Sequence, residues 1–533
     1  MVAEYLAATA LLGAQVLNHF DKLVFQSYFG TICVLHAAAA FSYYIVWRMF
    51  LWRWIFSPLR GVGGPKSHWF YGNFREIFKE DIGVPHIRWM KAHHDQPFIR
   101  YFGLFGYERV LVNSLPALQH ILTNCYDFPK SGNLARAIKT ILGAEGILFA
   151  EGDIHKRQRK QMNPSFSYAK LKSMSPIFWS KAQQMVEAWS GLLETTNEIE
   201  VVSGLSAATL DIIGSAGFGT EFNAIGGLTD PTIRNKLASA YADLFDVKKT
   251  AKVLGVVTFY LPWVRRLPLP RHLELNRDIK VIQTMSQELI SSKVERTNRG
   301  EDIGNDIFAL LLKDNKRKEA AKDPNDPPMT LREIGDQTMT LLAAGHETTS
   351  AGTAWALYAL SIDQTIQDRL RAELTSAIEA NEEPSFEKIE SLHYLNNFTK
   401  EVLRFYPPVP MTLRTATVTT VVDGVSIPAG TDMFISPIAT NRNIHIWGPD
   451  AESFNPDRWD NLPSTHNNYG METFLHGARG CIGQRFAVVE MKCLIAAMLI
   501  NLKFEPKPNH VVKPQSSITM RPHGGLPLIL TRL

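Results

Sequence analysis

The chain has 533 residues, of which 45% are hydrophobic and 20% are charged, so it can bury a large core and is neither disordered nor fibrous. The 56 basic and 52 acidic residues leave a formal net charge of +4, too even a balance for a protein that binds nucleic acid through bulk electrostatics. The four cysteines are far apart and form no C-x-x-C pair, which argues against a disulfide scaffold or a thiolate zinc site and favours a reducing compartment.

The N-terminal region predicts a membrane anchor at residues 1–59. Residues 23–47 carry no charged side chain and would span roughly 37 Å as a helix, more than the ~30 Å apolar core of a bilayer. Interfacial aromatics and cations follow, namely Trp47, Trp52, Trp54, Arg48, Arg53, Arg60 and Lys66, which predict that the rest of the chain stays in the cytosol. A cleaved signal peptide is the alternative, but the basic n-region is missing. Residues 5–17 form a shorter apolar run, so one or two membrane segments both remain open.

The remainder, residues 60–533, shows no second composition break and no internal repeat, and we expect one domain. Most of it has helical periodicity, and the pair Thr330 and Glu333 predicts a capping box at the start of a long helix. Alternation in residues 98–113 and 417–435 predicts strands, whereas the charged, proline-containing stretch 313–328 predicts an exposed loop. The expected fold class is therefore mainly α, an α+β protein with small β-sheets. No glycine-rich loop of the G-x-G-x-x-G type follows a strand, so a nucleotide or flavin domain is not expected.

Residues 474–483 read Phe-Leu-His-Gly-Ala-Arg-Gly-Cys-Ile-Gly and precede an amphipathic stretch that reaches about residue 500. A thiolate at a helix N-terminus is stabilised by the helix dipole and by backbone N–H groups, and the glycines allow a close approach of that backbone. A buried structural cysteine in a glycine-rich turn is the alternative for any lone cysteine. The ten residues together resemble the haem-binding signature F-x-x-G-x-R-x-C-x-G of the cytochrome P-450 family, without a departure.

A second motif, Ala-Gly-His-Glu-Thr-Thr, occupies residues 344–349 within the expected long helix. Its glycine weakens the helix and Thr348 can bond to a carbonyl one turn back, so we expect a local kink with room for a small ligand. The motif resembles the family's oxygen-activation sequence A-G-x-E-T-T. This resemblance implies that Thr348 hydrogen-bonds dioxygen and that Glu347 feeds a proton relay. His346 stands at the family's variable position, and we expect it to pack or to face solvent.

A third motif combines Glu401 and Arg404 with Arg458 in the sequence Pro-Asp-Arg-Trp. Glu401 and Arg404 lie three residues apart and so share a helix face, where an exposed pair would stabilise the protein by less than about 1 kcal/mol. The apolar surroundings and the second arginine argue for a buried cluster. Glu401, Arg404 and Arg458 resemble the family's E-x-x-R helix and P-x-R-W loop. This resemblance implies that they form a structural triad behind the haem.

The resemblance covers residues 60 to the C-terminus and implies the cytochrome P-450 fold with one haem b, whose iron takes the Cys481 thiolate as its axial ligand. The residues expected to contact the haem otherwise are Arg479, Arg159, His155, Arg414, Phe474 and Gly483. His155 replaces the tryptophan usual in the family, and we expect its contact with a haem propionate to depend on pH near neutrality.

The resemblance also implies partners. Because the chain contains no flavin module, electrons from NADPH are expected to come through a separate NADPH-cytochrome P-450 reductase, with cytochrome b5 as a further candidate. A basic cluster at Lys156, Arg157 and Lys160 would steer that reductase, although a solvated helix face is the alternative. The expected location is the endoplasmic reticulum membrane with the catalytic domain in the cytosol.

The implied activity is monooxygenation of an apolar small molecule, and the sequence style favours a terpenoid or other natural product of fungal secondary metabolism. Fatty-acid or xenobiotic hydroxylation is the runner-up, and a peroxide-rearranging haem-thiolate isomerase or a non-enzymatic haem sensor are readings of other classes. By resemblance, the segments that face the substrate include residues 131–148, parts of 222–267, the expected kinked helix, residues 409–414 and the stretch near Ile518. Residues 256–270 would either dip into the membrane or form an ordinary core segment.

Overall fold

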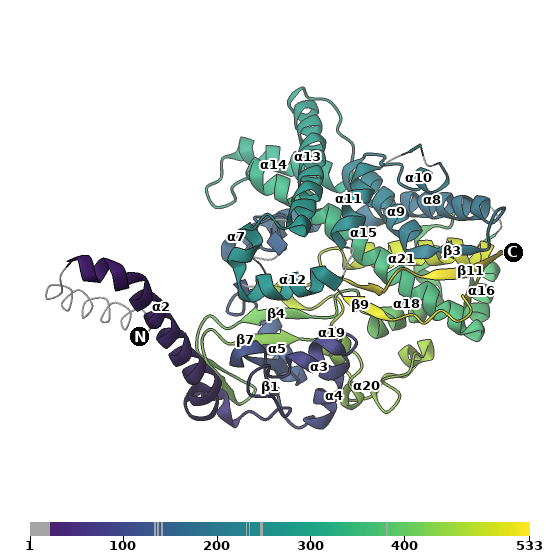
Figure 1. Ribbon diagram of the computed structural model, residues 1–533. Helices are drawn as coiled ribbons and strands as arrows, with labels where there is room; N and C mark the ends of the chain where they lie inside the picture. The colour runs from purple at the N-terminus through teal and green to yellow at the C-terminus, as the bar shows by residue number, and fades with distance from the viewer. Residues whose placement is uncertain are drawn as a thin grey trace.

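The computed structural model describes residues 22–533 except 133, 134, 136, 137, 140, 141, 231, 234, 246–248, 380, 381 and 517. The prediction of a mainly helical fold with small sheets is confirmed (Figure 1). The apolar run at residues 5–17 lies outside the described residues.

The helices of the body are α3 (Phe74–Lys79), α4 (Val84–Ala92), α5 (Leu115–Thr123), α7 (Gly152–Met162), α8 (Tyr168–Leu192), α9 (Val201–Ile212), α10 (Gly226–Thr229), α11 (Lys236–Phe245), α12 (Lys249–Tyr260), α13 (Pro270–Asn298), α14 (Ile307–Ala321), α15 (Leu331–Ile362), α16 (Gln364–Ala377), α17 (Phe386–Ser391), α18 (His393–Phe405), α19 (Pro437–Thr440), α20 (Ile444–Trp447) and α21 (Gln484–Asn501). The strands are β1 (Phe98–Phe102), β2 (Glu108–Val112), β3 (Glu198–Glu200), β4 (Thr412–Thr415), β5 (Thr420–Val422), β6 (Val425–Ile427), β7 (Asp432–Ile435), β8 (Leu502–Pro506), β9 (Pro514–Ser516), β10 (Met520–Pro522) and β11 (Pro527–Arg532).

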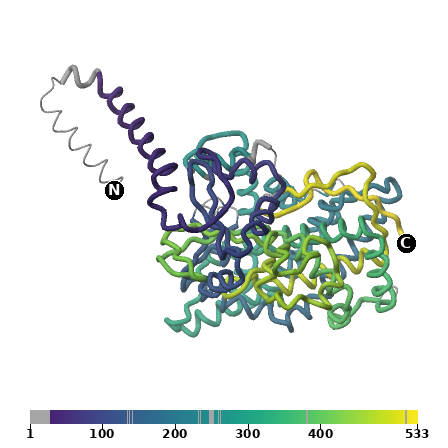
Figure 2. The backbone as a smooth tube through the Cα atoms, turned by 90° about the horizontal axis from the view of Figure 1, so that it is seen from below, coloured from purple at the N-terminus to yellow at the C-terminus, as the bar shows by residue number. Residues whose placement is uncertain are grey.

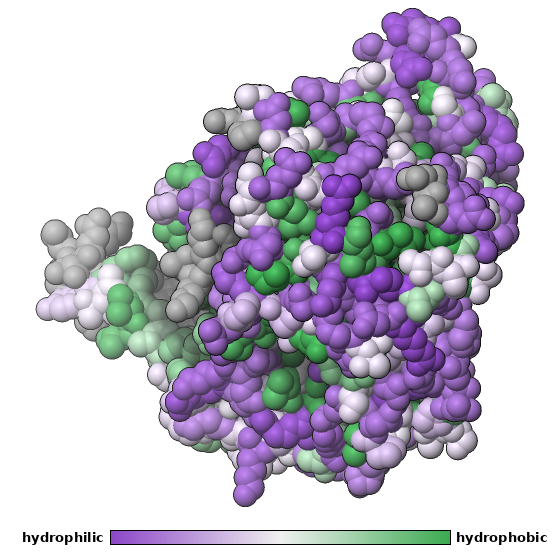
Figure 3. Space-filling view, turned by 90° about the vertical axis from the view of Figure 1, so that its right-hand side faces the viewer, coloured by the Kyte–Doolittle hydropathy of each residue, from purple (hydrophilic) through white to green (hydrophobic). Residues whose placement is uncertain are grey.

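An N-terminal helix, α2 (Lys22–Val46), projects from the body and continues as a π-helical segment, η1 (Trp47–Phe56) (Figures 1 and 2). Its stretch Tyr28–Phe56 is long and apolar enough to cross a membrane, and none of the apolar window within it is buried in the protein. Length and composition thus make it a candidate membrane anchor. The opposite side of the molecule is mostly hydrophilic, with hydrophobic residues interspersed (Figure 3).

The end of this N-terminal helix contacts the protein body. Trp52 and Arg53, which the sequence places at the membrane interface, are held by the protein body. The Trp52 Nε1 group donates to Glu108 (2.9 Å), and the Arg53 guanidinium lies 4.2 Å from the centre of the Phe102 ring. These two residues therefore contact the body as well as follow the apolar run, because β1 and β2 offer them a carboxylate and an aromatic face.

The largest sheet has the strand order β1-β2-β7-β4, in which β2 and β7 are parallel and the other neighbours are antiparallel. The predicted strand regions are confirmed, since residues 98–113 form β1 and β2, and residues 417–435 form β5, β6 and β7. Asp423 and Gly424 both have positive φ (47° and 76°), as the tight turn between β5 and β6 requires.

The long helix α15 packs against α9, α18 and α21 in the body (Figure 1). Its predicted capping box is confirmed, because Glu333 N donates to Thr330 Oγ1 (3.1 Å) and Thr330 N donates to Glu333 Oε2 (2.8 Å). The helix runs unbroken from Leu331 to Ile362. Beside it, α21 packs on α8 and carries the segment that follows Cys481.

The prediction of an exposed loop at residues 313–328 was wrong for its first half. Helix α14 extends to Ala321, because Asp306 caps its N-terminus by accepting from Ala309 N (3.0 Å) and because Phe308, Leu311 and Leu312 are buried on one face. The charges that suggested a loop lie mostly on the other face of this helix, and the loop begins after Ala321.

Candidate functional site

The cysteine loop is built by close backbone contacts. The Cys481 N–H donates to the Phe474 carbonyl (2.9 Å), and the Gly480 N–H donates to the Gly477 carbonyl (3.0 Å). Gly477 has φ +72°, and a Cβ atom there would lie 2.3 Å from the Leu122 carbonyl oxygen, so this turn requires glycine. The loop ends at Gly483, the residue before α21, and thereby sets Cys481 at a helix N-terminus.

The Cys481 side chain is exposed, although much of the fold surrounds it. The surrounding protein raises the pKa of its thiol, whereas the Gly483 N–H and the charges of Arg159 and Lys130 act in the opposite direction. Each of these three groups favours a thiolate, the form in which a cysteine binds a metal.

Three buried cations gather near this loop. The Arg414 side chain is 1% exposed, donates to Thr412 Oγ1 (2.9 Å) and to its neighbour's carbonyl, and has no partner for Nη2. Burial and the charge of Arg479 lower the pKa of Arg414 to about 10. Arg479 pairs with Glu151 through Nη2, but its buried Nη1 has no partner. Lys130 donates to the Leu148 carbonyl (2.5 Å), and burial together with Arg414 and Arg479 lowers its pKa far below the usual value.

This donor set fits the haem that the sequence motif implies. Two buried arginine nitrogens without a partner, next to a third buried cation, are costly unless an anionic group accepts from them. The carboxylates of the two haem propionates are such acceptors, and Cys481 is the soft ligand that haem iron takes. Sequence reasoning missed Lys130 and Glu151, because an isolated lysine or glutamate in a loop gives no pattern that separates it from a solvated one.

His155 and Arg159 lie on α7 beside the same loop. The His155 side chain is buried, and its Nδ1 hydrogen-bonds with the Tyr126 hydroxyl (3.0 Å). Burial and the charges of Arg479, Arg159 and Lys130 lower the pKa of His155 to about 3, which argues against the expected pH dependence near neutrality. Arg159 Nη1 donates to the Gly480 carbonyl (2.6 Å) and so binds the cysteine loop itself.

The side chains of the second motif point to different partners. Thr348 Oγ1 donates to the Ala344 carbonyl (2.7 Å), one turn back as expected. Glu347 Oε1 accepts from Thr519 Oγ1 (2.6 Å) and from Arg521, so its carboxylate is bound to the C-terminal hairpin. His346 packs in the core: it is 1% exposed and its Nδ1 lies 2.8 Å from the Leu342 carbonyl oxygen.

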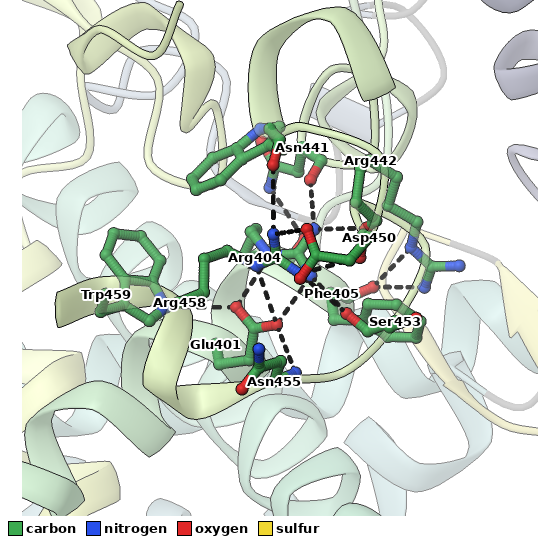
Figure 4. A network of polar contacts seen from close by, with 12 residues as sticks. Glu401, Arg404, Phe405, Asn441, Arg442, Asp450, Ser453, Asn455, Arg458 and Trp459 are labelled. Carbon is green, nitrogen blue, oxygen red and sulfur yellow. Dashed lines mark hydrogen bonds and ion pairs between the residues drawn. The ribbon is translucent and has the colours of Figure 1, made fainter. Parts of the chain in front are cut away.

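The third motif forms a buried polar network (Figure 4). Arg404 donates to both carboxylate oxygens of Glu401 (2.8 and 2.7 Å), and Arg458 Nε lies 3.5 Å from the same carboxylate. The Asn455 N–H (2.8 Å) and Trp459 Nε1 (3.1 Å) also donate to Glu401. Arg404 in addition donates to the carbonyls of residues 441 and 451 (2.7 Å each), so the network ties α18 to the loop that leads to the cysteine segment.

Only two of the three residues of the expected basic cluster are exposed at the surface. Lys156 and Lys160 are exposed and line a groove of about 600 Å³, together with Tyr126, Arg159, Asn163, Pro164 and Ala478. Arg157 instead turns inward, pairs with Glu333 and donates to the Pro328 carbonyl (2.9 Å). Its assignment to the surface cluster was wrong, because the start of α15 offers it a buried carboxylate.

Residues 256–270 cross the end of α12 and the short helix η6 (Pro262–Arg266). The side chains of Leu261, Trp263 and Leu267 are 47%, 57% and 40% exposed, so the alternative of an ordinary core segment is wrong for them. Tyr260 anchors this segment by accepting from the Leu104 N–H (3.1 Å), in the turn between β1 and β2.

The family model described as Cytochrome P450 matches residues 62–527. The chain is 34% identical to cytochrome P450 monooxygenase FUM15 of Gibberella moniliformis, over 90% of this chain and 88% of that protein. It is 32% identical to cytochrome P450 monooxygenase ALT8 of Alternaria alternata, over 98% and 97%, and 33% identical to cytochrome P450 monooxygenase sphH of Aspergillus fumigatus, over 97% and 96%.

Proposed function

The chain belongs to the cytochrome P450 family and is a P450 monooxygenase, and from this premise we propose that it inserts one oxygen atom from O₂ into an apolar natural product, with electrons from NADPH through a separate reductase. The observation that carries the proposal is the cysteine loop. It joins Cys481 at a helix N-terminus to buried arginines that have free donors. When bound, haem supplies the reduction of O₂ and the transfer of oxygen.

The chain's own residues bind and orient the cofactor in this proposal. The Cys481 thiolate would bind the haem iron, and the Gly483 N–H stabilises the charge of that thiolate. Arg414, Arg479 and Lys130 would hold the haem propionates. His155 stays neutral and buried at the same rim. Phe474 fixes the loop through its carbonyl and packs at the edge of the main hydrophobic core.

Proton transfer is assigned to Glu347 and Thr348. A carboxylate and a hydroxyl in adjacent positions of one helix can pass a proton from the protein interior to a ligand beside that helix. The triad of Glu401, Arg404 and Arg458 lies in a network of its own and has a structural role in the proposal.

The substrate is proposed to be apolar, preferably a terpenoid or another product of fungal secondary metabolism, with fatty acids or xenobiotics as the second candidates. Met411, Leu413 and Ile518, from two of the expected substrate-facing segments, pack as partly buried hydrophobic side chains. A pocket lined by such side chains would bind a substrate by removing apolar surface from water, and it would have few groups to bind a charged substrate.

We further propose that residues 1–59 anchor the enzyme in the endoplasmic reticulum membrane, with residues 60–533 in the cytosol. Helix α2 projects from the body, and the exposed Trp263 and Leu261 add a second apolar contact with the lipid surface. The reductase, and cytochrome b5 where it takes part, would bind at the groove bordered by Lys156 and Lys160.

The test uses microsomes that contain the enzyme and a reductase. Product from a panel of terpenoids, fatty acids and aromatic compounds is measured with and without NADPH. Product that requires both NADPH and reductase supports the proposal, and product from an organic peroxide without either would favour an isomerase. In the enzyme with Thr348→Ala we expect less product and more hydrogen peroxide per NADPH. Thr353→Ala is the matched control, because Thr353 makes the same backward bond on the same helix, to the Thr349 carbonyl (2.9 Å).

A further inference from the structure

Side chains bond to most of the backbone carbonyls of α15 around its oxygen-activation motif. For the carbonyls of residues 342, 344, 345, 346 and 347 in turn, the partners are His346 Nδ1 (2.8 Å), Thr348 Oγ1 (2.7 Å), Thr349 Oγ1 (3.1 Å), Thr209 Oγ1 (3.0 Å) and Ser350 Oγ (3.1 Å). Side-chain bonds of this kind compete with the backbone ladder and weaken or bend a helix. Four of these five partners belong to α15 itself, and Thr209 comes from α9.

This turn of α15 has an open face and a buried face. Ala344 is exposed and Thr348 is half-buried, whereas His346 is only 1% exposed. Residues 344 and 348 are one turn apart and share a face of the helix, and residue 346 lies on the opposite side. Thr209 therefore contacts the turn from behind the face on which the Thr348 hydroxyl is open to a ligand.

The end of α9 that carries Thr209 is itself held in place. The Thr209 side chain is fully buried, and Asp211 accepts from two backbone N–H groups of the segment that follows η5 (2.8 and 3.0 Å). Ile213, at the start of the π-helical segment η5 (Ile213–Gly217), packs on Gly345, where a Cβ atom would lie 3.0 Å from two of its carbons. The end of α9 and the start of η5 thus give α15 one hydrogen bond and one apolar contact, at the adjacent residues 346 and 345.

The Thr209 hydroxyl has one proton and three carbonyls within hydrogen-bond distance. The Leu205 and Ser206 carbonyls of its own helix lie 2.9 and 3.3 Å away. Helix geometry brings the hydroxyl of any helical threonine close to the carbonyls three and four residues back, so these two distances need no further cause. The approach to the His346 carbonyl has no such local cause, because it depends on how α9 packs on α15.

We propose that Thr209 is a positioning residue for the reaction: its hydroxyl donates to the His346 carbonyl and thereby fixes the turn that holds Thr348 at the open face of α15. Without this donor the turn is held by bonds within α15 alone, and the Thr348 hydroxyl no longer keeps one place beside the reacting oxygen. A misplaced group of this kind lowers the efficiency of the step that it serves. More O₂ then takes up two electrons from NADPH and two protons and leaves as hydrogen peroxide. This role rests on the proposed function.

The experiment compares three variants of the holoenzyme with the wild type. Thr209→Val removes the donor and keeps the shape of the side chain, whereas Thr209→Ser keeps the donor. Thr338→Val is the matched control, because Thr338 is equally buried and its hydroxyl donates within α15, to the Ile334 carbonyl (3.1 Å). Product and hydrogen peroxide per NADPH are measured with reductase and the panel compound that the wild-type enzyme oxidises most.

For Thr209→Val we expect about 3- to 10-fold more peroxide per NADPH, as the loss of one hydrogen bond implies, and a KM for the panel compound within about twofold of the wild type. Thr209→Ser and Thr338→Val should stay within about twofold of the wild type in both quantities. In the Thr348→Ala background, Thr209→Val should raise peroxide release by less than about twofold, because the hydroxyl that it positions is already absent.

A second readout needs neither turnover nor substrate. Hydrogen exchange of backbone amides is measured by mass spectrometry on the resting holoenzymes, in peptides that cover residues 340–352. We expect Thr209→Val to speed exchange there by about 3- to 10-fold, because a bond from outside the helix no longer opposes local opening. Thr209→Ser should restore the wild-type rate, and Thr338→Val should leave the exchange of these peptides unchanged.

Three results would each overturn the positioning role: Thr209→Ser behaving like Thr209→Val, an equal rise in peroxide with and without Thr348, or unchanged exchange at residues 340–352 in Thr209→Val. The proposed function would still stand in those cases if the wild-type enzyme forms product with NADPH and reductase. If the wild-type enzyme oxidised nothing in the panel, the proposed function would fail, and hydrogen exchange would still decide whether Thr209 holds the turn.

Discussion

Replacing Glu401 by Gln should severely destabilise the protein. Four donors converge on the Glu401 carboxylate, two from Arg404, one from Trp459 and one backbone N–H, and Arg458 Nε lies 3.5 Å away as a second positive charge. Gln offers one acceptor oxygen, and its amide nitrogen would face groups that also donate. The substitution keeps the shape of the side chain but removes the only carboxylate that pairs with Arg404 in the described part of the chain.

The expected magnitude follows from the burial of the network. Glu401 and Arg404 are fully buried and the Arg458 side chain is 3% exposed, so no water is available to replace the lost charge. Removal of one partner from a buried ion pair costs about 3 to 5 kcal/mol, because the remaining charge stays buried. A domain is stabilised by only about 5 to 15 kcal/mol, so the variant would lose a large part of its stability.

The assay is urea unfolding of the haem-loaded enzyme, followed by tryptophan fluorescence, with haem absorbance as a second signal. Asp457→Asn is the matched control. Asp457 lies on the same helical turn as Arg458 and pairs with Arg369 at 2.8 Å, but the side chains of Asp457 and Arg369 are both about half exposed. Asp457→Asn should therefore lower the free energy of unfolding by less than about 1 kcal/mol. A Glu401→Gln variant as stable as Asp457→Asn would refute the argument that the buried carboxylate neutralises two arginines.

Three other results are expected. His86 is fully buried against Phe434, and burial lowers its pKa to about 4. The free energy of unfolding should therefore fall by about 2 kcal/mol from pH 7 to pH 5, because the unfolded chain takes up a proton that the native protein does not. His86→Leu should make the accompanying fall in melting temperature smaller. Lys130→Met should raise the rate of haem transfer to apomyoglobin by roughly tenfold, because a hydrogen-bond donor at the rim is lost. The pair Lys156→Glu and Lys160→Glu should raise the KM for the reductase but not the rate at saturation, and added salt should abolish the difference.

Local patterns were sufficient for the parts of the fold that local chemistry determines. The capping box at Thr330, the turn at Asp423 and the helix after Cys481 each depend on residues within a few positions of one another. The loop expected at residues 313–328 was wrong because composition alone does not show that the residues of α14 before it present a buried apolar face. The contact of Trp52 with Glu108 was not predicted for the same kind of reason, since the two residues are 56 positions apart.

The candidate site divides in the same way. Cys481, Thr348 and Glu401 stand in compact motifs, so the sequence identifies them before any contact is known. Lys130 and Arg521 do not. Arg521 meets Glu347 across 174 residues, and it does so because the hairpin is anchored at Trp355 and Pro408. The role of such a side chain depends on where a distant hairpin packs, so no motif spacing in the sequence predicts it.

His155 shows how burial changes the chemistry that a residue type suggests. Histidine in place of the family's tryptophan suggested a contact that titrates near neutrality, but burial and three neighbouring cations lower its pKa to about 3. The ring is therefore neutral, with one N–H donor and one acceptor. When the Tyr126 hydroxyl donates to Nδ1, the single ring proton stays on Nε2. A neutral imidazole in that tautomer offers one N–H donor from a planar ring, as an indole does, so the histidine would keep a donor and add no charge to a rim that already holds Arg414, Arg479 and Lys130.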